Sequence, residues 1–317
     1  MSVFKRRKIM LVTVIAAVAV FAVSALAAGA GFSGYERLKN AGFQMIDELS
    51  KDGGAYSNGM FFINMAVYID GEELIRQEST TIRDGDRKFS QESTYNGTRA
   101  YDDEMQFEFG RDSETVTYTD NDVVYRWYDG WNNESSFSER ENWSSYNNYP
   151  GIDEMMPPAQ RRFIEAVADA LIGDTRNYFI SDGNIVSIAL SGNQIPQIAQ
   201  YAVAAIAERA ERDAIFYGND VVSDFRIGVD ARFSNGRLEV ELDDNGNVIG
   251  MHLDVEISST VDGMLRSFRI TAELLTKNIG MTSIQKPDGN SYGRPILPSY
   301  EDDDSTGVTY AYGTAVA

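Results

Sequence analysis

The amino-acid sequence predicts an α+β fold, in which a curved antiparallel sheet wraps around helices, and three observations point to it. The stretch 237–275 alternates apolar and polar side chains in three successive segments. Earlier in the chain, Asp-Gly and Asn-Gly turns recur between segments rich in Thr, Tyr and Val. Three further segments carry apolar residues at helical spacing. Together these patterns indicate a sheet that is covered on one face and wet on the other.

The clearest strands are the three at 237–275. Each has one apolar face, while side chains such as Arg237, Glu239 and Glu241 occupy the other. The apolar stripes are Leu238, Val240 and Leu242, then Ile249, Met251, Leu253, Val255 and Ile257, and finally Phe268, Ile270, Ala272 and Leu274. Asn245-Gly246 and Asp262-Gly263 join them as hairpin turns.

The composition allows a packed core and excludes several classes of function. Of 317 residues, 43% are hydrophobic, and the formal net charge is -20. A surface this acidic repels phosphate backbones, so nucleic acid is not expected as a partner. The chain has no cysteine, which excludes disulfides, thiol catalysis, cysteine-zinc sites and a lipid-modified amino-terminal cysteine.

Residues 1–30 are predicted to be a signal peptide or an amino-terminal membrane anchor. Four basic residues, 5–8, precede a run without charge at 9–30. The Ala25-Leu26-Ala27 triplet fits cleavage after Ala27, which we favour, but the run is also long enough to cross a bilayer as a helix. With either outcome the basic flank stays cytoplasmic, so the rest of the chain is expected outside, either secreted or anchored to the cytoplasmic membrane.

The next elements are a helix and a long meander of strands. Ser33 and Glu36 form a capping box for a helix at 33–52, which Gly53 ends. A strand follows at 61–69, and turn signals then recur every nine to fourteen residues until Asp129-Gly130.

An aromatic passage at 125–149 interrupts this pattern. It holds Trp127, Trp131 and Trp143 among many Asn and Ser residues. We favour the interpretation that these side chains pack a loop against the edge of the sheet. The alternative is an interaction loop that contacts an envelope protein or a glycan.

The second half begins with helices and ends in a tail. Proline-led helices are predicted at 159–172 and 196–213, with a strand pair at 178–191 between them. Both helices are expected to fill the inner face of the curved sheet. The expected domain therefore spans 31–281, followed by a disordered acidic tail at 282–317 that is rich in Pro and Asp.

Two short motifs carry a resemblance to known proteins: a Tyr-x-x-Leu pattern at 35–38 and the run Leu-Ser-Gly-Asn-Gln-Ile-Pro at 190–196. With the element order, they resemble uncharacterised Firmicutes extracytoplasmic proteins that have the half-barrel shape of bacterial lipoprotein carriers of the LolA and LppX type. The resemblance spans about residues 33 to 281. It implies a half-barrel whose inner face holds acyl chains, although this chain lacks the carriers' lipidation cysteine.

The sequence offers little support for catalysis. His252 is the only histidine and is predicted to face solvent, so a catalytic triad and a two-histidine metal site are not expected. The run Asp243–Asn247 has the wrong spacing for an EF-hand and fits a hairpin turn better. We therefore predict a protein that is not an enzyme and has no cofactor, no metal and no catalytic residue.

The leading functional expectation is binding of an apolar or lipid-like ligand at the cell envelope. If the helices leave part of the curved sheet uncovered, its apolar face becomes a binding surface. The residues expected to line it are Phe61, Ile63, Met65, Met251, Leu253 and Phe268. The alternative expectation is a surface interaction module that uses the loop of Trp127, Trp131 and Trp143.

Overall fold

The computed structural model describes residues 34–50, 54–100, 106–120, 123–130, 135–141, 178–197, 199–201, 203–205, 207, 228–287 and 309–310. The expected export segment, the helix at 159–172, Trp131 and Trp143 lie outside these residues. Within them, no helix is long and apolar enough to cross a membrane.

The described residues form a large sheet, a long helix that lies on it, two short 3-10 helices (Ala55–Ser57 and Gly192–Gln194) and a second, small sheet. The long helix is α2 (Gly34–Ser50). The large sheet contains β1 (Asn58–Ile69), β2 (Glu72–Asp84), β3 (Arg87–Ala100), β4 (Gln106–Thr119), β5 (Val123–Gly130), β6 (Ser135–Glu141), β7 (Ile180–Asp182), β8 (Ile185–Ser191), β9 (Arg232–Leu242), β10 (Val248–Val261) and β11 (Met264–Lys277). The small sheet pairs β12 (Ser283–Ile284) with β13 (Thr309–Tyr310). Both of these strands lie within the stretch expected to be a disordered tail.

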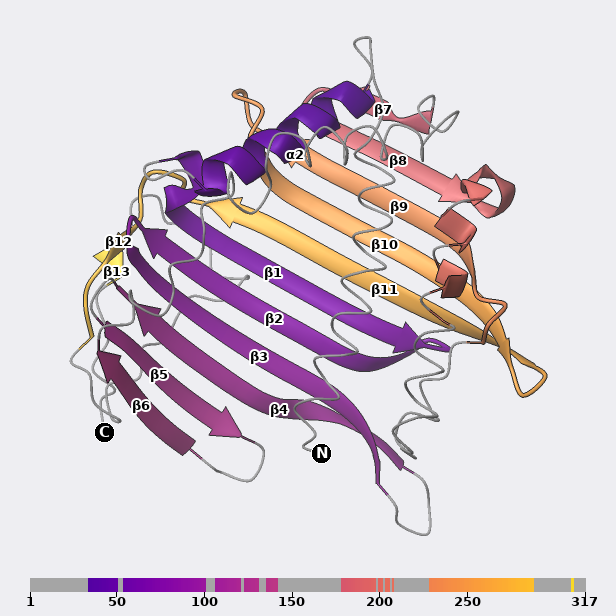
Figure 1. Cartoon of the computed structure of the whole chain (residues 1–317), viewed down its shortest axis with the longest axis horizontal. Coiled ribbons are helices and arrows are strands. Elements are labelled where there is room, and N and C mark those ends of the chain that lie inside the picture. The colour runs from indigo at the N-terminus through magenta and orange to yellow at the C-terminus, as the bar shows by residue number, and fades with distance from the viewer. Residues whose placement is uncertain are drawn as a thin grey trace.

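The large sheet is open, and every neighbouring pair of its strands is antiparallel. Its order is β6-β5-β4-β3-β2-β1-β11-β10-β9-β8-β7. The strands from the two halves of the chain meet where β1 pairs with β11. The sheet is broadly curved, as predicted, and α2 lies across one end of its strands (Figure 1). Helical residues between 197 and 207 lie toward the other end (Figure 1).

The alternation in β9, β10 and β11 is confirmed, with one local correction. Leu238, Val240 and Leu242 are buried while their neighbours on the other face are open. The register shifts between Val248 and Gly250, so Val248 takes the place opposite Leu242. A bulge of this kind adds one residue to one strand. Val248, and not the predicted Ile249, therefore joins the buried face.

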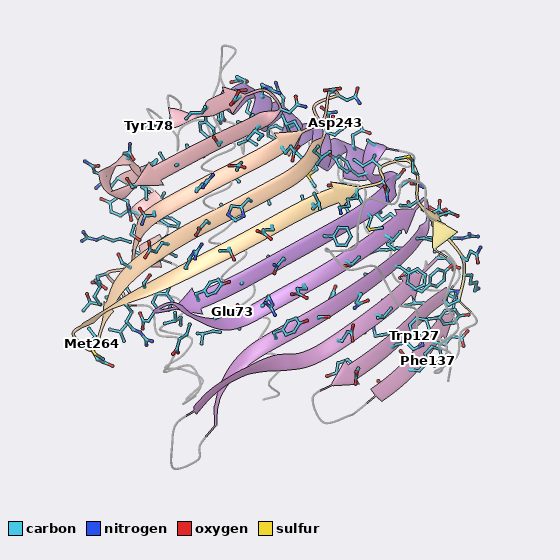
Figure 2. All side chains as sticks on the ribbon, turned by 180° about the vertical axis from the view of Figure 1, so that it is seen from behind. Glu73, Trp127, Phe137, Tyr178, Asp243 and Met264 are labelled. Atoms are coloured by element: carbon cyan, nitrogen blue, oxygen red, sulfur yellow. The ribbon has the colours of Figure 1, made fainter. Side chains whose placement is uncertain are left out.

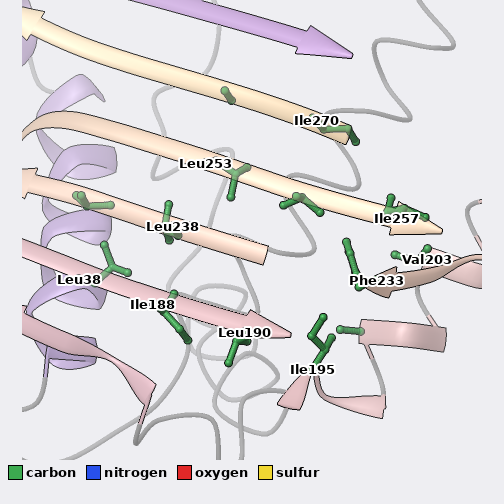
Figure 3. Close-up of a cluster of buried hydrophobic side chains, with 14 of the residues drawn as sticks. Leu38, Ile188, Leu190, Ile195, Val203, Phe233, Leu238, Leu253, Ile257 and Ile270 are labelled. Carbon is green, nitrogen blue, oxygen red and sulfur yellow. The ribbon is translucent and has the colours of Figure 1, made fainter. Parts of the chain in front are cut away.

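The first hydrophobic core lies on the face of the sheet that α2 covers. Strands β8 to β11 and the end of β1 form its floor, and Leu38 of α2 packs on it (Figure 3). At the other end of the strands, Ile195, Ala199 and Val203 pack against the same core (Figure 3). The buried positions of this segment are therefore spaced four residues apart, whereas Ala205 is exposed.

A second core lies on the opposite face, where the expectation of a single apolar face fails. Its side chains come from β1 to β5 and from the segment after β11; they are Met60, Phe62, Ile82, Phe89, Val116, Tyr118, Val123, Tyr125, Trp127 and Ile284. The register places Phe62 and Phe61 on opposite faces of β1. The apolar side of the sheet therefore changes at β1, which is apolar on both faces.

Residues 278–287, here called the C-terminal strap, cover this second core. Asn278 and Gly280 adopt positive φ angles of 54° and 77°, which turn the chain back after β11. The Ile284 side chain is then buried in the cluster. Lys286 Nζ lies 5.9 Å from the centre of the Tyr125 ring, a distance suited to a cation–π contact.

Candidate functional site

Four partly exposed apolar side chains form a continuous surface on the first-core face. Register pairs Met251 of β10 with Leu274 of β11, and Leu274 with Ile63 of β1. Met65 lies two residues further along the same face of β1. Ile63 is 42% exposed, and the other three are partly exposed. We call Ile63, Met65, Met251 and Leu274 the apolar patch.

The other predicted ligand-lining residues lie beside or below this patch. Phe61, Leu253 and Phe268 share its face, but each is almost fully buried. The structure therefore brings all six predicted residues to one face and divides them into two groups. Ile63, Met65 and Met251 can touch a ligand directly, whereas the three buried side chains support them from the core.

Leu274 belongs to the patch, although it was not among the residues predicted to line the ligand site. Its alternation with Ala272 placed it on the buried face, but its position between Met251 and Ile63 depends on the pairing of β11 with both β10 and β1. Alternation within a strand assigns a face, and only the register across strands assigns neighbours.

The patch has a polar border on β2. Cross-strand partners of Phe61, Ile63 and Met65 on β2 are Thr81, Ser79 and Gln77. Their hydroxyl and amide groups lie on the same face as the patch, because directly opposite residues of a pair point the same way. The surface is thus apolar on β1, β10 and β11 and polar on β2, which suits a ligand with one apolar and one polar part.

At one end of the strands, α2 is anchored by polar contacts. Arg37 Nη1 donates to Ser181 Oγ and to the carbonyl of Gly183, both at 2.6 Å. Below the helix, Tyr56 donates its hydroxyl to the carbonyl of Val248 at 3.2 Å. Burial raises the pKa of Tyr56 to about 12. The Arg37 bonds hold α2 against β7 and the turn before β8, while the Tyr56 bond ties the segment after α2 to the start of β10.

At the other end, one side chain ties the helical residues to the sheet. The Gln200 amide accepts from the backbone N–H of Phe233 at 2.9 Å and donates to its carbonyl at 3.0 Å. This amide occupies both hydrogen-bonding groups of Phe233, as a paired strand would. The helix end is therefore held at the start of β9, and the patch lies between the two anchored elements.

The opposite face of β9 to β11 is charged, but its groups pair with each other. Arg269 donates to both carboxylate oxygens of Asp254, at 2.9 and 2.7 Å. These hydrogen bonds hold the pKa of Asp254 below its ordinary value. His252 Nδ1 lies 3.2 Å from Oε1 of Glu273, and both side chains are about 40% exposed. The first contact is a cross-strand ion pair and the second a cross-strand polar contact, and both lie on a wet face.

The Asp243 carboxylate is used within its own turn. Its Oδ1 accepts from the backbone N–H of Asn245 and of Asn247, and its Oδ2 accepts from the side chain of Asn247. Burial alone would raise the pKa of Asp243, but these hydrogen bonds outweigh it and lower the pKa. The hairpin interpretation of this run agrees with the geometry, and the described residues contain no group of three side chains that could hold a metal ion.

Trp127 lies in strand β5 and not in a loop. Its side chain is 4% exposed and packs in the second core beside Phe137, with ring centroids 5.4 Å apart (Figure 2). Tyr125 lies 6.1 Å away in an edge-on arrangement. An indole buried in this way cannot reach a partner without opening the core, which corrects its assignment to an interaction loop.

Comparisons with known proteins identify no family. No protein-family model matches the chain, and no curated protein matches it. Among solved structures, a porin-like protein from Bacteroides uniformis is similar over 69% of this chain and 98% of its own, with 11% identity and a TM-score of 0.18. A bifunctional dehydratase-cyclase domain in ambruticin biosynthesis covers 74% of this chain and 81% of its own, with 11% identity and a TM-score of 0.12.

Proposed function

We propose that this chain is a non-catalytic, extracytoplasmic protein that binds an apolar or lipid-like ligand on the apolar patch. The observation that carries the proposal is the position of Ile63, Met65, Met251 and Leu274. These side chains lie together and partly exposed beside the buried side chains of the first core. Apolar side chains grouped on a supported surface are typical of ligand sites, and thioethers adapt to ligands of varied shape.

The polar border indicates the kind of ligand. A molecule with an acyl or similar chain can lie along β1, β10 and β11, while its polar part reaches Ser79 and Gln77 of β2. Burial of one apolar side chain stabilises such a complex by about 2 kcal/mol. The proposal includes a half-barrel fold like that of the lipoprotein carriers. It also includes a location outside the cytoplasmic membrane, which the pattern of residues 1–30 supports.

The first test is what the protein carries after purification. The full chain, purified from its expression host without lipid-like detergents, is analysed by native mass spectrometry, and its solvent extract is analysed for lipid. We expect bound apolar molecules in a defined ratio to protein. A chain that carries none, and that also leaves the emission of an added fluorescent fatty acid unchanged, contradicts the proposal.

A matched pair of variants locates the site. Ile63→Gln places a polar amide in the centre of the patch and is expected to weaken binding of the fluorescent fatty acid about tenfold. Ile180→Gln changes a side chain that is 65% exposed on edge strand β7 and should leave binding unchanged. Equal losses in both variants would place the ligand elsewhere.

A further inference from the structure

The hairpin formed by β10 and β11 extends beyond the strands on either side of it. These strands pair with each other as far as Val261 and Met264. However, β9 pairs with β10 only as far as Ser258, and β1 pairs with β11 only as far as Phe268. Three residue pairs therefore project past both neighbours, a length of about 10 Å. Figure 1 shows this hairpin reaching past the ends of the adjacent strands.

The end of this hairpin exposes large apolar side chains. Met264 is 67% exposed and Leu265 is 78% exposed. Val229, which is 55% exposed, lies on a neighbouring loop whose Gly228 N–H donates to Ser259 Oγ of β10 at 3.1 Å. We call Val229, Met264 and Leu265 the hairpin tip. Figure 2 shows Met264 at the end of the hairpin, and Asp243 lies at the other end of the sheet.

The hairpin tip is apolar on both faces of the ribbon. Met264 pairs with Val261 on one face, while Leu265 pairs with Thr260 on the other. A protein groove that docks one face of a hairpin would leave the second apolar side chain in water. A medium that surrounds the end of the hairpin buries both.

Two neighbouring turns hold the hairpin tip in this extended position. Asp70, in the turn between β1 and β2, accepts from Arg266 Nε and from the backbone N–H of Ser267, both at 2.9 Å. On the other side, Asp230 Oδ1 accepts from the backbone N–H of Thr260 at 2.8 Å. The projection is therefore built into the fold, so little conformational freedom is lost on insertion.

The charges around the hairpin tip select the type of surface. Asp230 and Asp262 are exposed acidic groups beside it, Arg232 is an exposed base near Asp230, and Arg266 is paired with Asp70. The whole chain carries a formal net charge of -20. Anionic lipid head groups would be repelled, whereas the outer ammonium groups of zwitterionic head groups complement these carboxylates.

We propose that the hairpin tip inserts Met264 and Leu265 into a zwitterionic lipid surface. The side chains enter end-on, with the carboxylates of Asp230 and Asp262 at the level of the head groups. Insertion orients the chain on a membrane through a contact that is separate from residues 1–30. This inference goes beyond the proposed function and does not depend on a ligand at the apolar patch, so either can fail alone.

The absence of cysteine from the chain permits a site-specific test. Leu265→Cys in the full chain is labelled with an environment-sensitive fluorophore and mixed with phosphatidylcholine vesicles that contain nitroxide lipids. Asp244→Cys, in the exposed turn between β9 and β10, is the matched control. We expect blue-shifted emission and quenching at 265 but not at 244. The difference between the labels carries the test, because residues 9–30 can themselves hold the chain on vesicles.

Further outcomes decide between lipid and other partners. In a second protein the fluorophore is attached at Met264→Cys. Adding Leu265→Asp to this protein is expected to lower its affinity for vesicles about tenfold. The urea concentration at the midpoint of unfolding should stay unchanged. Anionic lipid should weaken the signal at low salt, and added salt should restore it. Equal quenching at 265 and 244 overturns the proposal. A blue shift that grows with protein concentration and needs no vesicles also overturns it and indicates contact between copies.

Discussion

The Asn58 side chain binds both backbone groups of Thr282, which follows it by 224 residues. Its Oδ1 accepts from the Thr282 N–H at 2.7 Å, and its Nδ2 donates to the Thr282 carbonyl at 2.8 Å. An asparagine amide can replace a strand neighbour in this way, since it offers one donor and one acceptor. This contact seats the C-terminal strap, and with it Ile284, on the second core.

Asn58→Ala should therefore loosen the strap. The variant leaves the backbone groups of the buried Thr282 without their partner, and we expect the free energy of unfolding to fall by about 1–3 kcal/mol. Urea denaturation followed by far-UV circular dichroism measures the loss. Ser283→Ala changes an exposed residue of the same strap and is the control. If both variants have the wild-type urea midpoint of unfolding, the contact between Asn58 and the strap contributes nothing to stability.

Trp127→Ala distinguishes a core residue from an interaction residue. Removal of the buried indole should cost about 3–5 kcal/mol of unfolding free energy, because it opens a cavity beside Phe137 and Tyr125. Thermal and urea unfolding test this. A variant that keeps wild-type stability and loses only binding to a partner would instead support the interaction-loop hypothesis.

Asp243 should make folding sensitive to acid. Its pKa is lowered in the folded protein, so its stabilising contribution is complete above the ordinary carboxyl pKa of about 4 and is lost as the pH falls through the folded value. In Asp243→Asn, the free energy of unfolding should therefore fall less steeply below about pH 4 than in the wild type. Asp244→Asn, on the exposed neighbouring residue, should keep the wild-type slope.

Tyr56 should make folding sensitive to alkali. Burial raises its pKa to about 12, whereas tyrosine in the unfolded chain has a pKa of about 10. Its contribution to stability is complete below about pH 10 and is lost as the pH rises through this window. Tyr56→Phe should flatten the decline in unfolding free energy between these values, at the cost of its hydrogen bond to Val248. For Tyr178→Phe, at an exposed position, the unfolding free energy should decline with rising pH as it does for the wild type. Parallel curves for all three proteins would show that Tyr56 is not the group responsible.

Local patterns in the sequence predicted the elements well. Alternation identified β9 to β11 because each strand has one dry face, and turn pairs such as Asp70-Gly71 marked the meander. At Asp70 and Gly71, the φ angles of 52° and 89° are those that a two-residue hairpin turn requires.

Local patterns could not predict which side of the sheet the apolar side chains of distant strands share. Val116 and Tyr118 alternate with threonines in β4, as Leu238 and Val240 alternate with charged residues in β9. Which face of a shared sheet they occupy depends on the register of all intervening strands, including the pairing of β1 with β11. A turn of different length reverses the assignment. The second core therefore required the structure.

The strap was missed for a related reason. Residues 282–287 have the composition of a solvated tail, and their order depends on Asn58, Asp84 and Arg87, which lie far earlier in the chain. Local composition contains no information about such partners. The hairpin tip differs, since Met264-Leu265 after Asp262-Gly263 is visible in the sequence, but its overhang depends on where β9 and β1 stop.

The pairing of β1 with β11 also governs how the chain can fold. The two strands are separated by roughly 200 residues, so β1 emerges from the ribosome long before its central partner exists. Until β11 arrives, one edge of β1 is open, and contacts of such high contact order form slowly. The polypeptide is thus late to complete its sheet, and a nascent chain that ends before β11 carries an apolar strand edge prone to aggregation.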